Sequence, residues 1–209
     1  MAGSLKKGGE AERLRRELQE GESKGLRRRR WVIGLSLVGM GAMAAVSLFQ
    51  TGVVGHLPDP PVEGFDSDKV NSSETAYMLG VPDGTLSLAS LAANVPLAAF
   101  GGDDRAQVTP LVPLVAAGKS LVEAAVAGWY FYQMPSKEKR WCAYCIAGAL
   151  TNFAVAALTL PEAVESLEAL RRRGLAAEAN HLSETRMEEK KRSRLTVGNA
   201  LPSANEAKM

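Results

Sequence analysis

The sequence predicts an all-α membrane protein, a four-transmembrane-helix bundle with polar cytoplasmic tails. Three observations predict this class. Long stretches almost free of charge alternate with charged ones, although the chain as a whole is 46% hydrophobic and 23% charged. The apolar stretches approach the roughly 20 helical residues needed to cross a hydrocarbon core about 30 Å thick. Basic clusters flank the apolar region at both ends, as they do on cytoplasmic segments of membrane proteins.

Four segments are predicted to span the bilayer. The first, residues 31–49, is apolar and uncharged. A cleaved signal peptide is the alternative for it, but the apolar core of such a signal is usually about 7–15 residues long. The second, residues 86–100, is short and contains Pro96, so a buried soluble helix is its alternative. The third and fourth are residues 108–132 and 141–160.

Basic residues predict the orientation of these segments. Residues 27–30 are all arginine and precede the first span, and residues 171–173 are all arginine and follow the fourth. Basic residues next to a span stay in the cytoplasm, so we expect both termini there and the acidic loop at residues 50–85 outside. The basic link at residues 134–140 also falls outside and opposes the rule. If the second segment does not span, the topology beyond it inverts.

Three regions follow from this reading. Residues 1–30 form a cytoplasmic basic segment, residues 31–161 the transmembrane domain, and residues 162–209 a cytoplasmic charged tail. Membrane topology explains the basic runs, so we expect a lipid bilayer and no nucleic acid as the partner. Only two cysteines occur, which excludes a secreted fold stapled by several disulfides.

Cys142 and Cys145 form a Cys-Ala-Tyr-Cys motif at the start of the fourth segment. On a helix this spacing puts both sulfurs on one face, near enough to bridge. The N-terminal end of a helix also favours a thiolate. The alternative is two small buried residues that happen to be cysteines. A metal site is not expected, because His56 and His181 fall on opposite sides of the membrane. Dithiol chemistry at an oxidising outer face is the favoured interpretation.

Lys119 and Glu123 are the second candidate feature, because they lie four residues apart near the middle of the third segment. Ionisable residues at that depth are costly and are expected to face the bundle interior. Two interpretations stay open: a mutually neutralising pair that fixes the helix orientation, or a polar group near a bound headgroup or a proton path. Asn94 and Asn152 are interpreted as interhelical hydrogen-bonding residues rather than as ligands.

The predicted outer loop carries a more specific pattern. Residues 70–82 read VNSSETAYMLGVP. This stretch resembles the loop and the second-helix entry of the vitamin K epoxide reductase family. The Cys-Ala-Tyr-Cys motif resembles that family's redox motif, which also opens the fourth span, and the order of the parts agrees. The resemblance covers about residues 28–165, so both tails lie outside it.

The resemblance implies an enzyme of the bacterial inner membrane that transfers electrons between protein thiols and a membrane quinone of the ubiquinone or menaquinone type. Carried over by position, Cys142 exchanges disulfides with a partner and Cys145 faces the quinone. The activity supports disulfide formation outside the cytoplasm. The residues assigned to the quinone site are Ser72, Ser73, Lys119, Glu123 and Tyr144.

One departure from the family pattern matters. Typical members carry a pair of loop cysteines that shuttles electrons to the redox motif, whereas this chain has Ser67 at the aligned place. We therefore expect a separate thioredoxin-like thiol protein on the outer face to reach Cys142, the cysteine nearer the water. Two alternatives remain: a relative without turnover that serves as a membrane scaffold or complex subunit, and a small transporter that uses Lys119 and Glu123.

Overall fold

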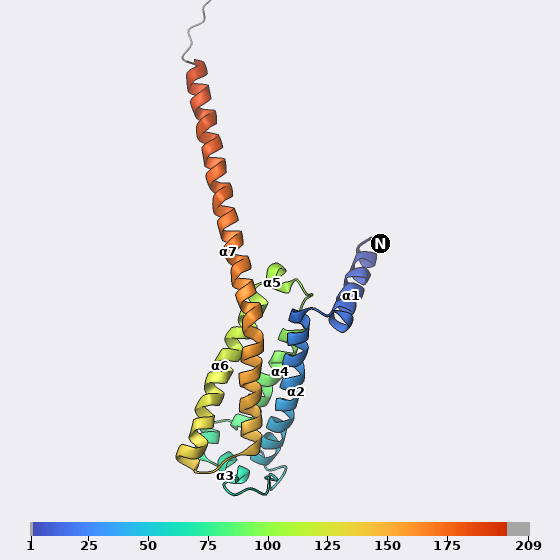
Figure 1. The fold of residues 1–209 in the computed structure, drawn as a ribbon, viewed down its shortest axis with the longest axis vertical. Helices are drawn as coiled ribbons and strands as arrows, with labels where there is room; N and C mark the ends of the chain where they lie inside the picture. Colours follow the sequence, from blue (N-terminus) through green and yellow to red (C-terminus); the bar gives the residue numbers. More distant parts are fainter. Residues whose placement is uncertain (1, 200–209) are drawn as a thin grey trace, which may run out of the picture. The chain divides into compact units, whose positions relative to one another are not determined.

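The described part of the protein is helical, in a computed structural model that describes the backbone of residues 2–199 and the side chains of residues 9–187. Figure 1 shows the order of the elements along the chain. The elements are α1 (Ala2–Glu20), α2 (Lys24–Gln50), α3 (Ser67–Asn71), η1 (Glu74–Tyr77), α4 (Asp83–Ala99), α5 (Arg105–Val108), α6 (Leu111–Gln133), η2 (Met134–Glu138) and α7 (Ala143–Asn199). The predicted all-α class is confirmed.

Three of these helices are long and apolar enough to cross a membrane. They cover Lys24–Gln50, Leu111–Glu138 and Ala143–Met187. They contain the first predicted span and most of the third and fourth, which were expected to begin at residues 108 and 141. The second predicted span forms α4, which has 17 residues and therefore a length of about 25 Å. Because α4 is shorter than the other three, its passage through the bilayer stays a prediction.

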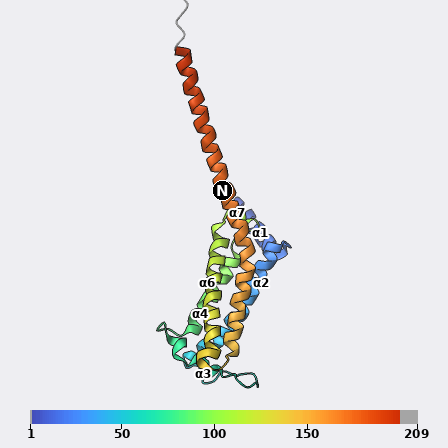
Figure 2. The same ribbon diagram turned by 60° about the vertical axis from the view of Figure 1, so that its left-hand side comes forward.

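The helices α2, α4, α6 and α7 pack side by side, as the two views in Figures 1 and 2 show. Glycines allow the close approach of α2 and α7. A Cβ atom on Gly39 would come within 2.9 Å of Thr151, and one on Gly148 within 2.9 Å of the Met43 side chain. Small residues serve this purpose where no hydrophobic effect drives helices together. Helices α2 and α7 therefore pack closely at these two glycines.

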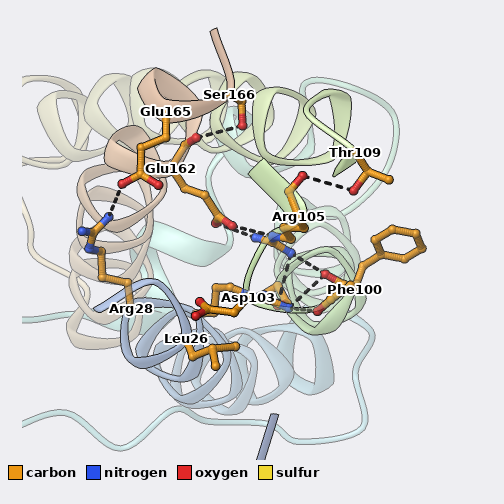
Figure 3. Close-up of polar contacts among 12 residues, drawn as sticks. Leu26, Arg28, Phe100, Asp103, Arg105, Thr109, Glu162, Glu165 and Ser166 are labelled. Carbon is orange, nitrogen blue, oxygen red and sulfur yellow. Dashed lines mark hydrogen bonds and ion pairs between the residues drawn. The ribbon is translucent and has the colours of Figure 1, made fainter. Parts of the chain in front are cut away.

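Two buried arginines close the bundle at the end where α5 lies. Arg29 and Arg105 donate hydrogen bonds to the last carbonyl groups of α4 and of the turn after it, in residues 97–102. A helix leaves these carbonyls unpaired, and cations stabilise them. Arg105 also forms a two-pronged ion pair with Glu162 of α7, with both N···O distances 2.6 Å (Figure 3). The arginines thereby tie α2, α4 and α7 together.

At the opposite end, which we call the α3 end (residues 51–82 and 134–142), the loop after α2 folds over the beginning of α7. The Trp141 N–H donates to Gly64 O and the Asp66 N–H donates to Trp141 O, both at 2.9 Å. Gln50 Nε2 adds a bond of 3.3 Å to the Asn71 carbonyl. These bonds hold α3 against the beginning of α7, where the two cysteines lie.

The chain divides into two compact units, residues 1–167 and 168–209. In the second unit the helix α7 continues to Asn199, and the described side chains of residues 171–187 are all exposed. That exposure matches the predicted polar character of the tail over those residues. The part of the tail prediction that concerns residues 200–209 lies outside the described residues.

Candidate active site

The two cysteines form a disulfide at the first turn of α7. Cys142 directly precedes the helix, and Cys145 lies in its first turn. Their Cα atoms are 5.2 Å apart, within the usual range for a disulfide. The Cys145 N–H donates to Cys142 Sγ at 3.1 Å, so the sulfur occupies the position of a helix N-cap. The same N–H and the helix dipole would stabilise a thiolate at Cys142 after reduction.

Asn71, which sequence reasoning did not assign to the site, bridges the two sulfurs. Its side-chain Nδ2 lies 3.2 Å from Cys142 Sγ, and its Oδ1 lies 3.5 Å from Cys145 Sγ. Nδ2 also donates to Ser67 O at 2.7 Å, and the residue is 2% exposed. The amide can therefore donate to a Cys142 thiolate while it accepts from a Cys145 thiol. The sequence signal that could have identified Asn71 was its position in the VNSS stretch of the loop, residues 70–73.

Cys142 is completely buried, which corrects one expectation. The sequence suggested that this cysteine, nearer the helix end, is open to the water. Instead it packs with Val70 of α3 and with Met134 in a buried cluster. Ser67, the residue at the aligned cysteine position, accepts a hydrogen bond at 3.3 Å from the N–H of Ala143, the neighbour of Cys142. The loop thus covers the sulfur that a partner was expected to reach.

Cys145 lies on the wall of a cavity of about 310 Å³ among α2, α4, α6 and α7. Most of the wall is apolar. The polar side chains on it are Asn71, Asp83, Ser87, Ser90, Glu123, Tyr130 and Asn152. A cavity of this size, lined by apolar groups with a few polar ones, is typical of a site for a small organic molecule.

The predicted pair of Lys119 and Glu123 is present and faces the bundle interior. Lys119 Nζ lies 2.5 Å from Glu123 Oε1 and also bonds the Ser90 carbonyl and Asn94 Oδ1 of α4. The hydroxyl of Ser90 donates to the same Glu123 oxygen. Glu123 reaches the cavity wall. Through these bonds the ion pair links α4 and α6, and its part in ligand binding stays a prediction.

A second, smaller cavity of about 30 Å³ lies on the loop side of Cys145. Its lining is mixed and includes Ser73 and Thr75 of the loop. Five residues line both cavities: Asn71, Asp83, Tyr130, Met134 and Cys145. Asp83 Oδ1 accepts a hydrogen bond of 2.6 Å from Gln50 at the end of α2. Cys145 and Asp83 therefore lie between the space at the α3 end and the larger space between the helices.

The remaining predicted site residues lie apart from the larger cavity. Ser72 is exposed, and Ser73 lines only the smaller cavity. Tyr144 points its hydroxyl toward the loop, where it donates to Pro58 O at 3.0 Å. Neither Ser72 nor Tyr144 is on the wall of either cavity. Their assignment to quinone binding stays a prediction that this arrangement does not favour.

The two asparagines of the spans have different roles. Asn94 bonds Lys119 and Glu123 of α6, as the interhelical interpretation predicts. For Asn152 the interpretation is wrong, because its Oδ1 is buried and has no hydrogen-bond partner among the described residues. Asn152 lies instead on the wall of the larger cavity.

Comparison with known proteins agrees with this geometry. The sequence model of the vitamin K epoxide reductase family matches residues 30–160, which is more than half of the chain. A search among curated proteins found no match to the chain. The matched region contains the loop, the disulfide and the four helices around the cavity. The chain belongs to the vitamin K epoxide reductase family.

Proposed function

We propose that the protein is a membrane thiol–quinone oxidoreductase that works through the Cys142–Cys145 disulfide. The observation that carries the proposal is the position of Cys145, which is bonded to Cys142 and also lies on the wall of the 310 Å³ cavity. From that position Cys145 can exchange electrons with Cys142 at the α3 end and with a ligand held between the helices. Membership of the family supports the same function.

The cavity fits the ring of a quinone by size and by chemistry. A substituted six-membered ring is flat and mostly apolar, with oxygens only at opposite edges. The wall combines apolar side chains with the side chain of Asn152, whose buried oxygen has no hydrogen-bond partner among the described residues. A buried polar atom without a partner is costly, so a ligand that hydrogen-bonds it is stabilised. Ubiquinone or menaquinone are the membrane quinones to test.

In the first half of the cycle, a thiolate of a partner dithiol attacks Cys142, and the bond between the two cysteines breaks. Cys145 leaves as a thiolate, and the second partner thiol then releases Cys142. The partner is oxidised to a disulfide while Cys142 and Cys145 are reduced. Asn71 can hold the Cys142 sulfur through Nδ2 and the Cys145 sulfur through Oδ1 during this exchange. Thiolates are the attacking and leaving species in each step.

In the second half, the disulfide forms again. A bound quinone supplies a two-electron acceptor that also takes up two protons. Cys145 gives up electrons from the cavity wall, and the two thiols lose their protons as the sulfurs bond. Two acidic side chains lie on that wall, and Glu123 is already paired with Lys119. Asp83 also lines the smaller cavity, so it is placed to pass these protons toward the α3 end.

Access to Cys142 requires the loop to move. Because α3 buries Cys142 and Ser67 cannot act as a redox shuttle, the partner thiol must reach the site when α3 lifts. We propose a separate thioredoxin-like protein as that partner. Oxidation of a reduced thioredoxin-like protein by the purified protein with added quinone tests the assignment, and dependence on Cys142 is the expected result.

The proposed location is the bacterial inner membrane, with four spans, the α3 end outside and both termini in the cytoplasm. The arginines at residues 27–30 and the acidic loop support this orientation. In a Cys-free background, a cysteine placed at exposed Ser72 should react with an impermeant maleimide on intact cells, and one at exposed Glu178 should not. Labelling of position 178 from outside would invert the topology.

A non-catalytic scaffold is the second candidate. Two features favour it: the serine at position 67 leaves the disulfide without an internal electron donor, and the burial of Cys142 shields it from an external thiol. Redox titration separates the two candidates. An enzyme must pass reversibly between the disulfide and the dithiol form, whereas a structural disulfide resists reduction until the protein unfolds.

A further inference from the structure

Three side chains of the described residues have a buried polar atom without a hydrogen-bond partner, Arg28, Ser36 and Asn152, and of these three Asn152 alone lies on the wall of the larger cavity. Its Oδ1 is buried without a hydrogen-bond partner among the described residues, while Asn94, at a comparable place in α4, is bonded on both sides of its amide. Leaving such a group unpaired costs about 1–3 kcal/mol. An apolar residue would avoid that cost on a wall that is otherwise mostly apolar. The Asn152 amide is therefore placed to gain its hydrogen-bond partner only when a ligand is bound.

The helix α7 places Asn152 and Cys145 on the same surface. Four residues of this helix line the larger cavity: Cys145, Gly148, Ala149 and Asn152. Their spacing of three, four and seven residues puts them in one stripe along the helix. Gly148 and Ala149 carry little or no side chain, so the middle of the stripe is flat. The sulfur and the amide stand at its two ends, about 10.5 Å apart at 1.5 Å rise per residue.

A flat strip with a thiol at one end and an unpaired amide at the other matches a planar ring with oxygens at opposite edges. An amide can donate to a ring carbonyl through its nitrogen and accept from a ring hydroxyl through its oxygen. The same residue can therefore bind both the oxidised and the reduced form of the ring. The other polar groups near Glu123 are already bonded to one another.

We propose that Asn152 is the residue that orients the quinone, binding the ring oxygen farther from Cys145 while the ring lies on Gly148 and Ala149. This inference rests on the proposed thiol–quinone function and adds the direction in which the ring is held. It assigns Asn152 to ligand binding and Asn94 to structure. The chemical class of ligand is a para-quinone.

Two substitutions test the assignment, Asn152→Leu and the matched control Asn94→Leu. The probe is menadione, a naphthoquinone without a tail, and its affinity for the disulfide form is measured by equilibrium dialysis in detergent. We expect Asn152→Leu to raise the thermal midpoint of the quinone-free protein, because it removes an unpaired buried amide. We expect the same variant to bind menadione about tenfold more weakly, which corresponds to about 1.4 kcal/mol.

The control should behave in the opposite way. Asn94→Leu removes hydrogen bonds to Lys119 and Glu123, so it should lower the thermal midpoint. If wild type binds menadione and Asn152→Leu binds it equally well, the role of Asn152 is overturned and the proposed function stands. If wild type does not bind menadione, both fail together. Asn152→Ala, which keeps space in the cavity, repeats the binding test should the leucine variant not fold.

Discussion

Asn71 Nδ2 lies 3.2 Å from Cys142 Sγ, and this contact connects the loop helix α3 to the redox pair. The two residues are 71 positions apart in the sequence, and both are buried. The same amide reaches Cys145 with its oxygen. From this contact and the burial of Cys142 we expect α3 to respond to the state of the disulfide and to shift before an external thiol attacks Cys142.

The first prediction concerns the charge beside Cys142. Asn71→Asp keeps the size of the side chain but replaces the donor by a carboxylate, which disfavours a thiolate on the neighbouring sulfur. We expect the disulfide to become harder to reduce, with a reduction potential lower by about 30 mV for each 1.4 kcal/mol. Equilibration with a dithiothreitol buffer measures this potential. Ser72→Asp, which adds the same charge at an exposed neighbour, should leave it unchanged. Equal shifts in both variants would mean that the contact does not tune the pair.

The second prediction concerns Ser67. Its hydroxyl accepts from the Ala143 N–H beside Cys142, so a thiol there should meet the Cys142 sulfur. In a Cys145→Ala background, we expect Ser67→Cys to form a disulfide with Cys142 under mild oxidation. Mass spectrometry after maleimide treatment counts the free thiols. Ser72→Cys, at an exposed position just after α3, should keep both thiols free. Free thiols in the position 67 variant would show that the loop does not rest on Cys142.

The third prediction concerns the pH dependence of the loop. His56 Nδ1 lies 2.5 Å from Asp68, and the hydrogen bond to Asp68, with its charge, raises the pKa of His56 above 6.5. Burial alone would raise the pKa of Asp68, but hydrogen bonds from His56 and the Leu57 N–H lower it instead. The contribution of His56 is fully present below its ordinary pKa and is lost as the pH rises through its raised value.

The acidic limit comes from Asp68. Its contribution is present above its ordinary pKa and is lost only as the pH falls through the lowered value. We therefore expect the loop to be held most firmly at mildly acidic pH. Cleavage by trypsin at Lys69 should accelerate as the pH is raised above 7, after correction for the activity of trypsin itself. A His56→Gln variant should lose this dependence. The same pH profile in the variant would exclude the pair as its cause.

The fourth prediction concerns the α5 end. Arg105 is 3% exposed and its side chain is paired with Glu162, so Glu162→Gln leaves a buried cation without its partner. Such a change costs about 3–5 kcal/mol. The control is Glu165→Gln, which removes a weak pair of 4.0 Å between Arg28 and an exposed carboxylate and should cost about 0–1 kcal/mol. Thermal unfolding in the same detergent compares the two. Similar midpoints for both variants would contradict the closing role of Arg105.

The sequence was informative where local chemistry decides the structure. Hydropathy located α2, α6 and α7, and the spacing of Cys142 and Cys145 predicted that they can bridge. It was uninformative where packing brings distant residues together. The VNSS stretch marks Asn71 as part of a family-like loop but does not place it on the sulfurs, because that contact depends on how the loop folds back over α7. The burial of Cys142 has the same origin.

The arginines before the first span also show which features the sequence could predict and which it could not. Their number predicted an orientation, but not that Arg29 turns inward to bind the carbonyls at the end of α4. The sequence also placed Asn94 and Asn152 in one class. Only the packed bundle separates them, since Asn94 meets the Lys119 pair and Asn152 meets a cavity.

One measurement tests the central claim most directly. The purified protein, reduced to the dithiol and freed of reductant under anaerobic conditions, is mixed with one equivalent of menadione. Quinone absorbance and the number of free thiols are followed together. The account predicts that one quinone is reduced for each Cys142–Cys145 disulfide formed, and that Cys145→Ala abolishes both changes. A dithiol that persists unchanged beside oxidised quinone would contradict it.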